Sequence, residues 1–301
     1  MKDQLDLFRH ERKTSPPPPL HTPKEVSPDS TILAALWPYS IYLTSEGYTK
    51  NTIGAFIRDI HILKSFVGDL SVGKICTQDL RNFVAYLRDR CQEKPKSVYR
   101  RVTGIKNFLR WLKMEKIIQE DPSAAFYLTR PVPPLPVILN DEECRWLLLE
   151  ASKTPRDYLI VLLLLEGGLK RNELLDLEPA HVDIQNTYRP TVLVNAPKRG
   201  RSIVLPPDFT PGYKAYVETL RPSDKLFPYT ERGISHVIWQ TAERAKIKKH
   251  VSSQILRDTY VVRKIRAGET IENALKKVGL STGAMNAETI EKYRKLSAGP
   301  V

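Results

Sequence analysis

The amino-acid sequence predicts a mainly α-helical fold with one small antiparallel sheet, shared between two domains. Three observations support this prediction. Apolar residues recur at helical spacing along most of the chain, while two short β-branched runs, Thr191–Val194 and Ser202–Leu205, interrupt that spacing. Five prolines fall between Pro122 and Pro136 and predict a stiff connector. A length of 301 residues suits one large or two ordinary domains with real cores.

Composition excludes several classes of protein. With 41% apolar and 27% charged residues, the chain is neither fibrous nor wholly disordered. Its longest apolar run, Tyr158 to Leu165, is far shorter than the roughly 18 residues of a membrane span, and the N-terminus lacks the apolar stretch of a secretion signal. The cysteines Cys76, Cys91 and Cys144 are widely spaced, which predicts neither a disulfide framework nor a zinc site. A cytoplasmic location is the simplest expectation.

The first domain is predicted over residues 30–122, after a disordered proline-rich tail at residues 1–29. Apolar stripes predict four helices, which begin near Ser30, after the caps Thr49 and Thr77, and near Lys96. The fourth helix is strongly basic. One interpretation is an ordinary solvated face; the other is a surface that follows DNA phosphates, with these basic residues as candidates: Lys96, Arg100, Arg101, Lys106 and Arg110.

The second domain is predicted over residues 140–301, after a linker at residues 123–139. Asn140 and Glu143 form a capping-box pattern before one helix, and a buried helix follows and ends at Gly167-Gly168. The two β-branched runs predict a hairpin whose tip, residues 195–200, is exposed and basic. The remaining helices are predicted at residues 211–220, 233–246, 252–267, 271–277 and 288–295.

The charge of the chain points to nucleic acid. The formal net charge is +13, and the isoelectric point is near 9.5. Both domains are net basic, and the stretch from Arg244 to Arg266 holds eight basic residues and the single acidic residue Asp258. We therefore expect double-stranded DNA as the partner, held between two basic domains.

Two segments of the second domain resemble those of the tyrosine recombinase, or phage integrase, family. Residues 166–177, EGGLKRNELLDL, are similar to the family pattern T-G-L-R-x-x-E-L-x-x-L, and the downstream D-[IV] is present at residues 183–184. Residues 254–260, QILRDTY, resemble H-x-L-R-H-T-[FY]. The resemblance implies a SAM-like core-binding domain of four helices, followed by an α+β domain of the tyrosine recombinase catalytic type.

That resemblance also implies a reaction. Family members cleave DNA through a tyrosine that attacks a backbone phosphorus and forms a 3′-phosphotyrosyl link, without a cofactor. Two arginines hold the phosphate oxygens, histidine-type residues handle the tyrosine proton, and a hairpin lysine protonates the leaving oxygen. No cofactor and no metal are therefore expected in this chain.

Three family positions are kept in this sequence. Arg257 resembles the second arginine, Lys198 (or Arg199) the hairpin lysine, and Tyr293 the nucleophile within residues 289–295, TIEKYRK. The alternative for Tyr293 is an ordinary half-buried helical tyrosine. The alternative for Lys198 is a solvated hairpin tip.

Three other family positions are changed. Lys170 stands where the first arginine is expected, Gln254 replaces a histidine, and Leu280 replaces a histidine or tryptophan. Lysine lacks the planar fork that grips two phosphate oxygens, glutamine takes no proton at neutral pH, and leucine neither takes a proton nor donates a hydrogen bond. Arg171 and His250 are the candidates that could compensate, although adjacent helical residues such as Lys170 and Arg171 point about 100° apart.

The sequence thus favours a DNA-binding protein of this fold with lost or strongly reduced strand cleavage, acting as a regulatory, architectural or accessory subunit, with an active recombinase or its own copies as further partners on DNA. The first alternative is an active recombinase or integrase with an atypical site, and the second is a protein-interaction module. In either DNA-binding hypothesis, the phosphate-contacting candidates are Lys96, Arg100, Arg101, Lys106, Arg110, Arg171, Arg199, Arg201, Lys248 and Lys249.

Overall fold

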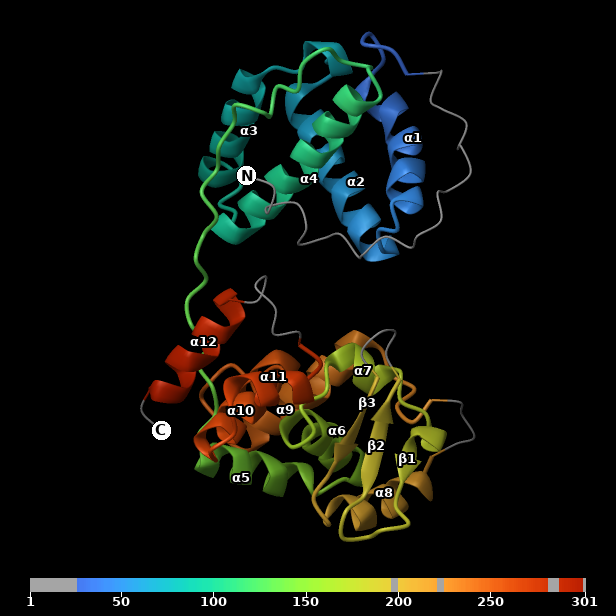
Figure 1. The fold of residues 1–301 in the computed structure, drawn as a ribbon, viewed down its shortest axis with the longest axis vertical. Coiled ribbons are helices and arrows are strands. Elements are labelled where there is room, and N and C mark those ends of the chain that lie inside the picture. The colour runs from blue at the N-terminus through green and yellow to red at the C-terminus, as the bar shows by residue number, and fades with distance from the viewer. Residues whose placement is uncertain (1–25, 196–199, 221–224, 281–286, 300–301) are drawn as a thin grey trace. The chain divides into compact units, whose positions relative to one another are not determined.

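The computed structural model describes residues 26–195, 200–220, 225–280 and 287–299 (Figure 1). The chain divides into two compact units at the bond between Pro133 and Pro134, within the proline-rich stretch that the sequence marks as a connector. Each unit has its own apolar core. We describe them separately below as the N-terminal and C-terminal units.

The N-terminal unit contains the four helices that the apolar stripes predict. They are α1 (Ile32–Ser45), α2 (Lys50–Val67), α3 (Thr77–Asp89) and α4 (Pro95–Met114), with a short 3-10 turn, η1 (Val72–Lys74), between α2 and α3. The cap of α3 differs from the prediction. Cys76, not Thr77, precedes the helix, because the Asp79 carboxylate accepts the Cys76 N–H at 2.8 Å, while the Thr77 hydroxyl donates to the Pro122 carbonyl at 2.7 Å.

Aromatic rings fill the centre of this unit. Tyr39 of α1 is fully buried, packs edge-on against Phe108 and lies near Trp111, both of α4. Its hydroxyl donates to the Asn107 amide oxygen at 2.8 Å, so the one polar atom of the buried ring is satisfied. Helices α1 and α4 are thereby fixed by the same stripe of residues that the sequence marks as apolar.

A buried charge joins α2 to α4. Asp59 of α2 is fully buried, and Arg100 grips its two oxygens at 2.7 and 2.6 Å while Arg101 donates at 3.0 Å. Gly104 permits this approach, because a Cβ atom there would stand 2.9 Å from the Phe56 ring. Two of the basic residues on the predicted DNA-facing helix therefore serve an internal ion pair.

The C-terminal unit is helical around one small sheet. Its helices are α5 (Asp141–Ala151), α6 (Pro155–Leu165), α7 (Arg171–Leu175), α8 (Phe209–Val217), α9 (Glu231–Arg244), α10 (Ser253–Arg266), α11 (Ile271–Lys277) and α12 (Ala287–Ala298), with the 3-10 turn η2 (Pro179–His181). The strands β1 (Val182–Asp183), β2 (Thr191–Val194) and β3 (Arg201–Val204) form an antiparallel sheet in the order β1-β2-β3. The predicted hairpin is β2 and β3, in the register Val192 to Ile203, and β1 is an addition to the prediction.

Helix α6 lies at the centre of the main core, because every residue from Leu159 to Leu165 is buried. It packs against α5, α8, α9 and α10. A smaller cluster joins α10, α11 and α12 and includes Tyr260, Val278 and Tyr293. The fold class predicted from the sequence, mainly α with a small antiparallel sheet, is confirmed (Figure 1).

The ion pair between α2 and α4 predicts a pH-dependent stability. Burial raises the pKa of Asp59, although the hydrogen bonds and charges of Arg100 and Arg101 oppose that rise. A carboxyl whose pKa rises on folding favours the fold below its unfolded pKa of about 3.9, and this contribution declines as the pH rises. Removing both arginines leaves the ionised carboxylate unpaired, which costs about 3–5 kcal/mol near pH 7.

The variant Arg100→Ala/Arg101→Ala is therefore expected to lose stability at pH 7 and less of it near pH 4, where Asp59 can take a proton. The loss of stability is measured by urea unfolding of the full chain at both pH values. Hydrogen exchange of the α2 and α4 amides shows whether the loss lies in these two helices. Adding Asp59→Asn is the control and should recover part of the loss. An equal loss at both pH values would contradict the role of the buried charge.

Candidate functional site

Three residues of the predicted site, Gln254, Arg257 and Tyr293, lie on α10 or on the helix packed against it. Ser252 caps this helix by accepting the Ile255 N–H at 3.3 Å. Gln254 and Asp258 are one turn apart and share a face, while Arg257 is the neighbour of Asp258. Helix α12, which carries Tyr293, packs on both α10 and α11. Tyr293, Gln254 and Arg257 thus reach one region of the unit.

Tyr293 does not face solvent. Its side chain is 1% exposed, and its hydroxyl donates to Oδ1 of Asp258 at 2.6 Å. The same oxygen accepts the Gln254 amide at 2.9 Å, and the second oxygen accepts the Lys292 ammonium at 2.7 Å. We call these four residues, Gln254, Asp258, Lys292 and Tyr293, the Asp258 cluster.

The surroundings of Tyr293 keep its proton in place. Burial raises the pKa of the Tyr293 hydroxyl, the charge of Asp258 and its hydrogen bond raise it further, and Arg257 opposes them only in part. The Lys292 ammonium lies over the ring, 4.9 Å from its centroid. In this arrangement the phenol is a hydrogen-bond donor, and its ionised form, which would be the nucleophile, is disfavoured.

Arg257 is held by the main chain. Its two terminal nitrogens donate to the carbonyl oxygens of Gly168, at 2.9 Å, and Val278, at 2.5 Å, and the residue is 2% exposed. Burial lowers the pKa of the guanidinium, while the charge of Glu173, 3.8 Å away, acts in the opposite direction. Arg257 thereby ties the turn after α6 to the end of α11.

Gly168 makes that arrangement possible. Its φ angle is +63°, in the left-handed region, and a Cβ atom would stand 2.7 Å from both the Tyr260 ring and the Val278 side chain. The turn therefore needs glycine both for its backbone conformation and for space. This turn explains why Gly168 is required within the family-like segment at residues 166–177.

The Glu173 carboxylate contacts basic side chains and one backbone N–H. Arg201 of β3 donates to both carboxylate oxygens at 2.9 Å, the Lys170 N–H donates at 2.8 Å, and the Lys170 ammonium lies 3.7 Å away. Burial alone would raise the pKa of Glu173, but the hydrogen bonds from Arg201 and Lys170 bring it below its ordinary value. Arg201 also donates to the Lys277 carbonyl at 2.8 Å, so its guanidinium has a structural use.

The remaining predicted site residues are dispersed. Leu280 packs against the apolar cluster that contains Tyr293. Arg171 hydrogen-bonds to Glu231 and Ser235 of α9, and His250 is exposed in the loop between α9 and α10. Lys198 and Arg199 lie outside the described residues.

Apart from Arg171 and Arg199, the DNA-binding candidates fall into two groups, one paired within the protein and one exposed. Arg100, Arg101 and Arg201 make the internal pairs described above. Likewise, Lys106 donates to the Phe126 carbonyl at 2.6 Å, and Lys249 donates to Glu143 at 2.6 Å. The three candidates that the structure leaves exposed are Lys96, Arg110 and Lys248.

Sequence reasoning missed the residues at the centre of the site. In the sequence, Asp258 is only the single acidic residue of a basic stretch, and Lys292 is only one residue of the segment that contains Tyr293. A signal was present, because Asp258 stands at the second histidine of the pattern H-x-L-R-H-T. A change from histidine to aspartate beside a kept arginine replaces a group that can carry positive charge with a negative one.

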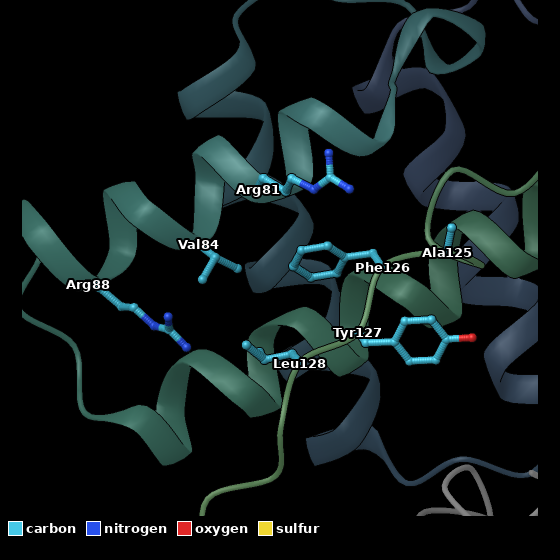
Figure 2. A pocket seen from close by; sticks show the side chains of 7 residues that line it. All are labelled: Arg81, Val84, Arg88, Ala125, Phe126, Tyr127 and Leu128. Atoms are coloured by element: carbon cyan, nitrogen blue, oxygen red, sulfur yellow. The ribbon is translucent and has the colours of Figure 1, made fainter.

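The N-terminal unit has a groove of about 450 Å³ between α3 and residues 125–128 (Figure 2). Arg81 and Arg88 extend from α3 on either side of Val84, and the Phe126 ring points toward that helix. Tyr127, at the rim, is 79% exposed. None of the predicted site residues lines this groove, and we give it no part in the site.

Within the described ranges, no group of three or more histidine, cysteine, aspartate or glutamate side chains is placed to hold a metal ion. In the same part of the chain, every helix is too short or too polar to cross a bilayer.

Comparisons with known proteins agree with the motifs. The family model described as "Phage integrase, N-terminal SAM-like domain" matches residues 38–116. A tyrosine recombinase of Thermosipho africanus (strain TCF52B) is 25% identical over 249 residues, which cover 78% of this chain and 86% of the relative. Tyrosine recombinase XerC of Bacillus subtilis (strain 168) is 23% identical over 264 residues, covering 80% and 86%.

Solved structures share the fold. A lambda integrase dimer bound to a COC′ core site has a TM-score of 0.71 at 15% identity, covering 90% of this chain and 79% of that one. The XerH site-specific recombinase bound to difH substrate has a TM-score of 0.64 at 14% identity, covering 87% and 81%. This chain is thus similar in sequence to tyrosine recombinases over about four-fifths of its length, its residues 38–116 match the phage integrase SAM-like domain, and its fold is shared with lambda integrase and XerH, in agreement with the two motif segments.

Proposed function

We propose that this protein binds double-stranded DNA through the tyrosine recombinase fold and has lost, or strongly reduced, its strand-cleavage activity. Its role would be regulatory, architectural or that of an accessory subunit beside an active recombinase. One observation carries the proposal: two positions where the family pattern has a proton-transferring ring hold Gln254, which donates to the same Asp258 oxygen as Tyr293, and Leu280, which packs against the apolar cluster that contains Tyr293. Neither exchanges a proton near neutral pH.

The reaction needs such groups. When a tyrosine oxygen bonds to the phosphorus, the bond from phosphorus to the 5′-oxygen breaks, the phenol loses its proton and the 5′-oxygen gains one. In this site the Tyr293 pKa is raised, the Gln254 amide donates its hydrogen bond, and Leu280 lies against apolar side chains. The chain thus retains the nucleophile position without groups that would ease its ionisation.

Phosphate binding at the site is also weakened. Lys170 offers an ammonium next to Glu173, not a guanidinium fork, and Arg257 uses both terminal nitrogens on main-chain carbonyls. Stabilisation of a pentavalent phosphorane depends on donors aimed at its oxygens. Two of the cationic positions are therefore occupied within the protein.

DNA binding is supported by different residues. Lys96, Arg110 and Lys248 are exposed on a chain with a net charge of +13. Each phosphate that such a residue neutralises releases counterions and adds affinity that falls with salt. Lambda integrase and XerH, whose folds this chain shares, are bound to DNA in their solved structures, and lambda integrase is bound there as a dimer and as a tetramer. Self-association on DNA is part of the proposal.

One observation favours the alternative, an active recombinase with an atypical site. The Asp258 carboxylate accepts the Tyr293 hydroxyl at 2.6 Å and is a group that can take a proton. In that case Asp258 replaces the missing histidines. The protein-interaction alternative has no such contact in its favour and predicts binding that changes little with salt.

Cleavage is tested with a suicide duplex that carries a binding site selected with the full-length protein. We expect no more covalent adduct from the wild type than from Tyr293→Phe, because the phenol keeps its proton and its oxygen is buried. Adduct is measured by denaturing gel. A wild-type adduct that disappears in Tyr293→Phe would overturn the proposal and establish the active alternative.

The exposed basic residues predict a second result. In Lys96→Ala/Arg110→Ala, affinity for duplex DNA should fall about tenfold or more near 0.1 M salt, and the slope of log affinity against log salt should decrease by up to about 2. Filter binding or anisotropy across a salt series measures both quantities. Arg145→Ala/Lys214→Ala removes the same charge from exposed positions on α5 and α8 and is the matched control. Equal losses in both variants would show that net charge alone, and not the α4 face, binds DNA.

A further inference from the structure

We propose that Asp258 is a built-in anion that occupies the phosphate-binding end of the site, holds Tyr293 inward with its proton, and so suppresses attack on DNA. This inference rests on the proposed function, since it names the residue that suppresses DNA cleavage. The family pattern has histidine where this chain has Asp258. Asp258 is also the only acidic residue in the sequence between Arg244 and Arg266.

The contacts of Asp258 are those of a bound anion. The residue is 1% exposed, and three different side chains donate to its two oxygens: a phenol, a primary amide and an ammonium, at 2.6, 2.9 and 2.7 Å. Hydroxyl, amide and ammonium groups are the donors that proteins use for phosphate oxygens. The carboxylate therefore engages the local donors that a phosphodiester would need.

The negative charge of Asp258 prevents a phosphodiester from binding to the same donors. A phosphodiester brings a second negative charge, and two anions in a water-poor site repel each other strongly. Among the described residues, Lys292 is the cation that hydrogen-bonds to the carboxylate, and Arg257, the neighbour of Asp258 in sequence, donates to the carbonyls of Gly168 and Val278. The charge of Lys292 is thus neutralised by Asp258, and both terminal nitrogens of Arg257 have acceptors, before DNA arrives.

The same carboxylate holds the nucleophile. Tyr293 lies in the apolar cluster of α10, α11 and α12 with its one polar atom on Asp258. The charge of Asp258 and its hydrogen bond are among the causes that raise the Tyr293 pKa, so removing that charge lowers it. A neutral residue at position 258 would release the Lys292 ammonium from its ion pair. It would also make the Tyr293 phenol easier to ionise.

The test is the substitution Asp258→Asn, which keeps the shape of the side chain and removes its charge. We expect the covalent adduct on the suicide duplex to rise at least tenfold above the wild type and to vanish when Tyr293→Phe is added. In the reaction, Tyr293 Oη bonds to phosphorus, the bond to the 5′-oxygen breaks, and a proton passes from the phenol to that oxygen through water.

Controls separate this effect from general loosening. Asp157→Asn changes another buried aspartate of the same unit, which pairs with Arg156 and Arg244, and should leave adduct formation unchanged. Duplex affinity and melting temperature are measured for each variant. Asp258→Ser serves as a second neutral variant if Asp258→Asn is poorly folded. Ultraviolet titration of the phenols, compared with Tyr293→Phe, should show a lower Tyr293 pKa in the neutral variants.

The outcomes distinguish the two proposals. Adduct from Asp258→Asn but not from the wild type supports both of them. No adduct from either, with folding and DNA binding intact, overturns the role of Asp258 and leaves the proposed function standing. An active wild type that gains further activity in Asp258→Asn overturns only the proposed function. An active wild type that loses activity in Asp258→Asn overturns both, because Asp258 is then the proton acceptor.

Discussion

Two consecutive buried charges on α10 organise the C-terminal unit. An ionised side chain taken out of water is tolerated only when other groups replace its hydration. Arg257 meets this requirement with the carbonyl oxygens of the turn after α6 and of the end of α11, and Asp258 meets it with donors from α10 and α12. The positions of α6, α11 and α12 around α10 are therefore linked to two side chains of opposite sign.

Much of the fold was predictable because it follows from local pattern. The four helices of the N-terminal unit, the capping box at Asn140 and the hairpin of β2 and β3 each depend on residues close together in sequence. Capping was less certain at α3, where a cysteine precedes the helix and Asp79 supplies the hydrogen bond from inside it. Local sequence patterns thus predicted which helices and strands form more reliably than the residue at which each one begins.

The use of each charged residue was not predictable in the same way. The sequence marks Arg100 and Arg101 as basic surface, but their partner Asp59 lies 41 and 42 residues away and is buried. Lys249 and Glu143, 106 residues apart, pair for the same reason. Sequence reasoning located Gln254, Arg257 and Tyr293 and missed Asp258, because an acidic group between basic ones reads as an incidental charge until its neighbours in space are known.

The shared carboxylate of the Asp258 cluster also constrains how this protein can evolve. Because Gln254, Lys292 and Tyr293 all donate to one side chain, a change at any of the four positions alters the hydrogen bonding of the other three. A histidine placed at position 254 alone would lie against the carboxylate of Asp258. The four positions should therefore vary together among related sequences.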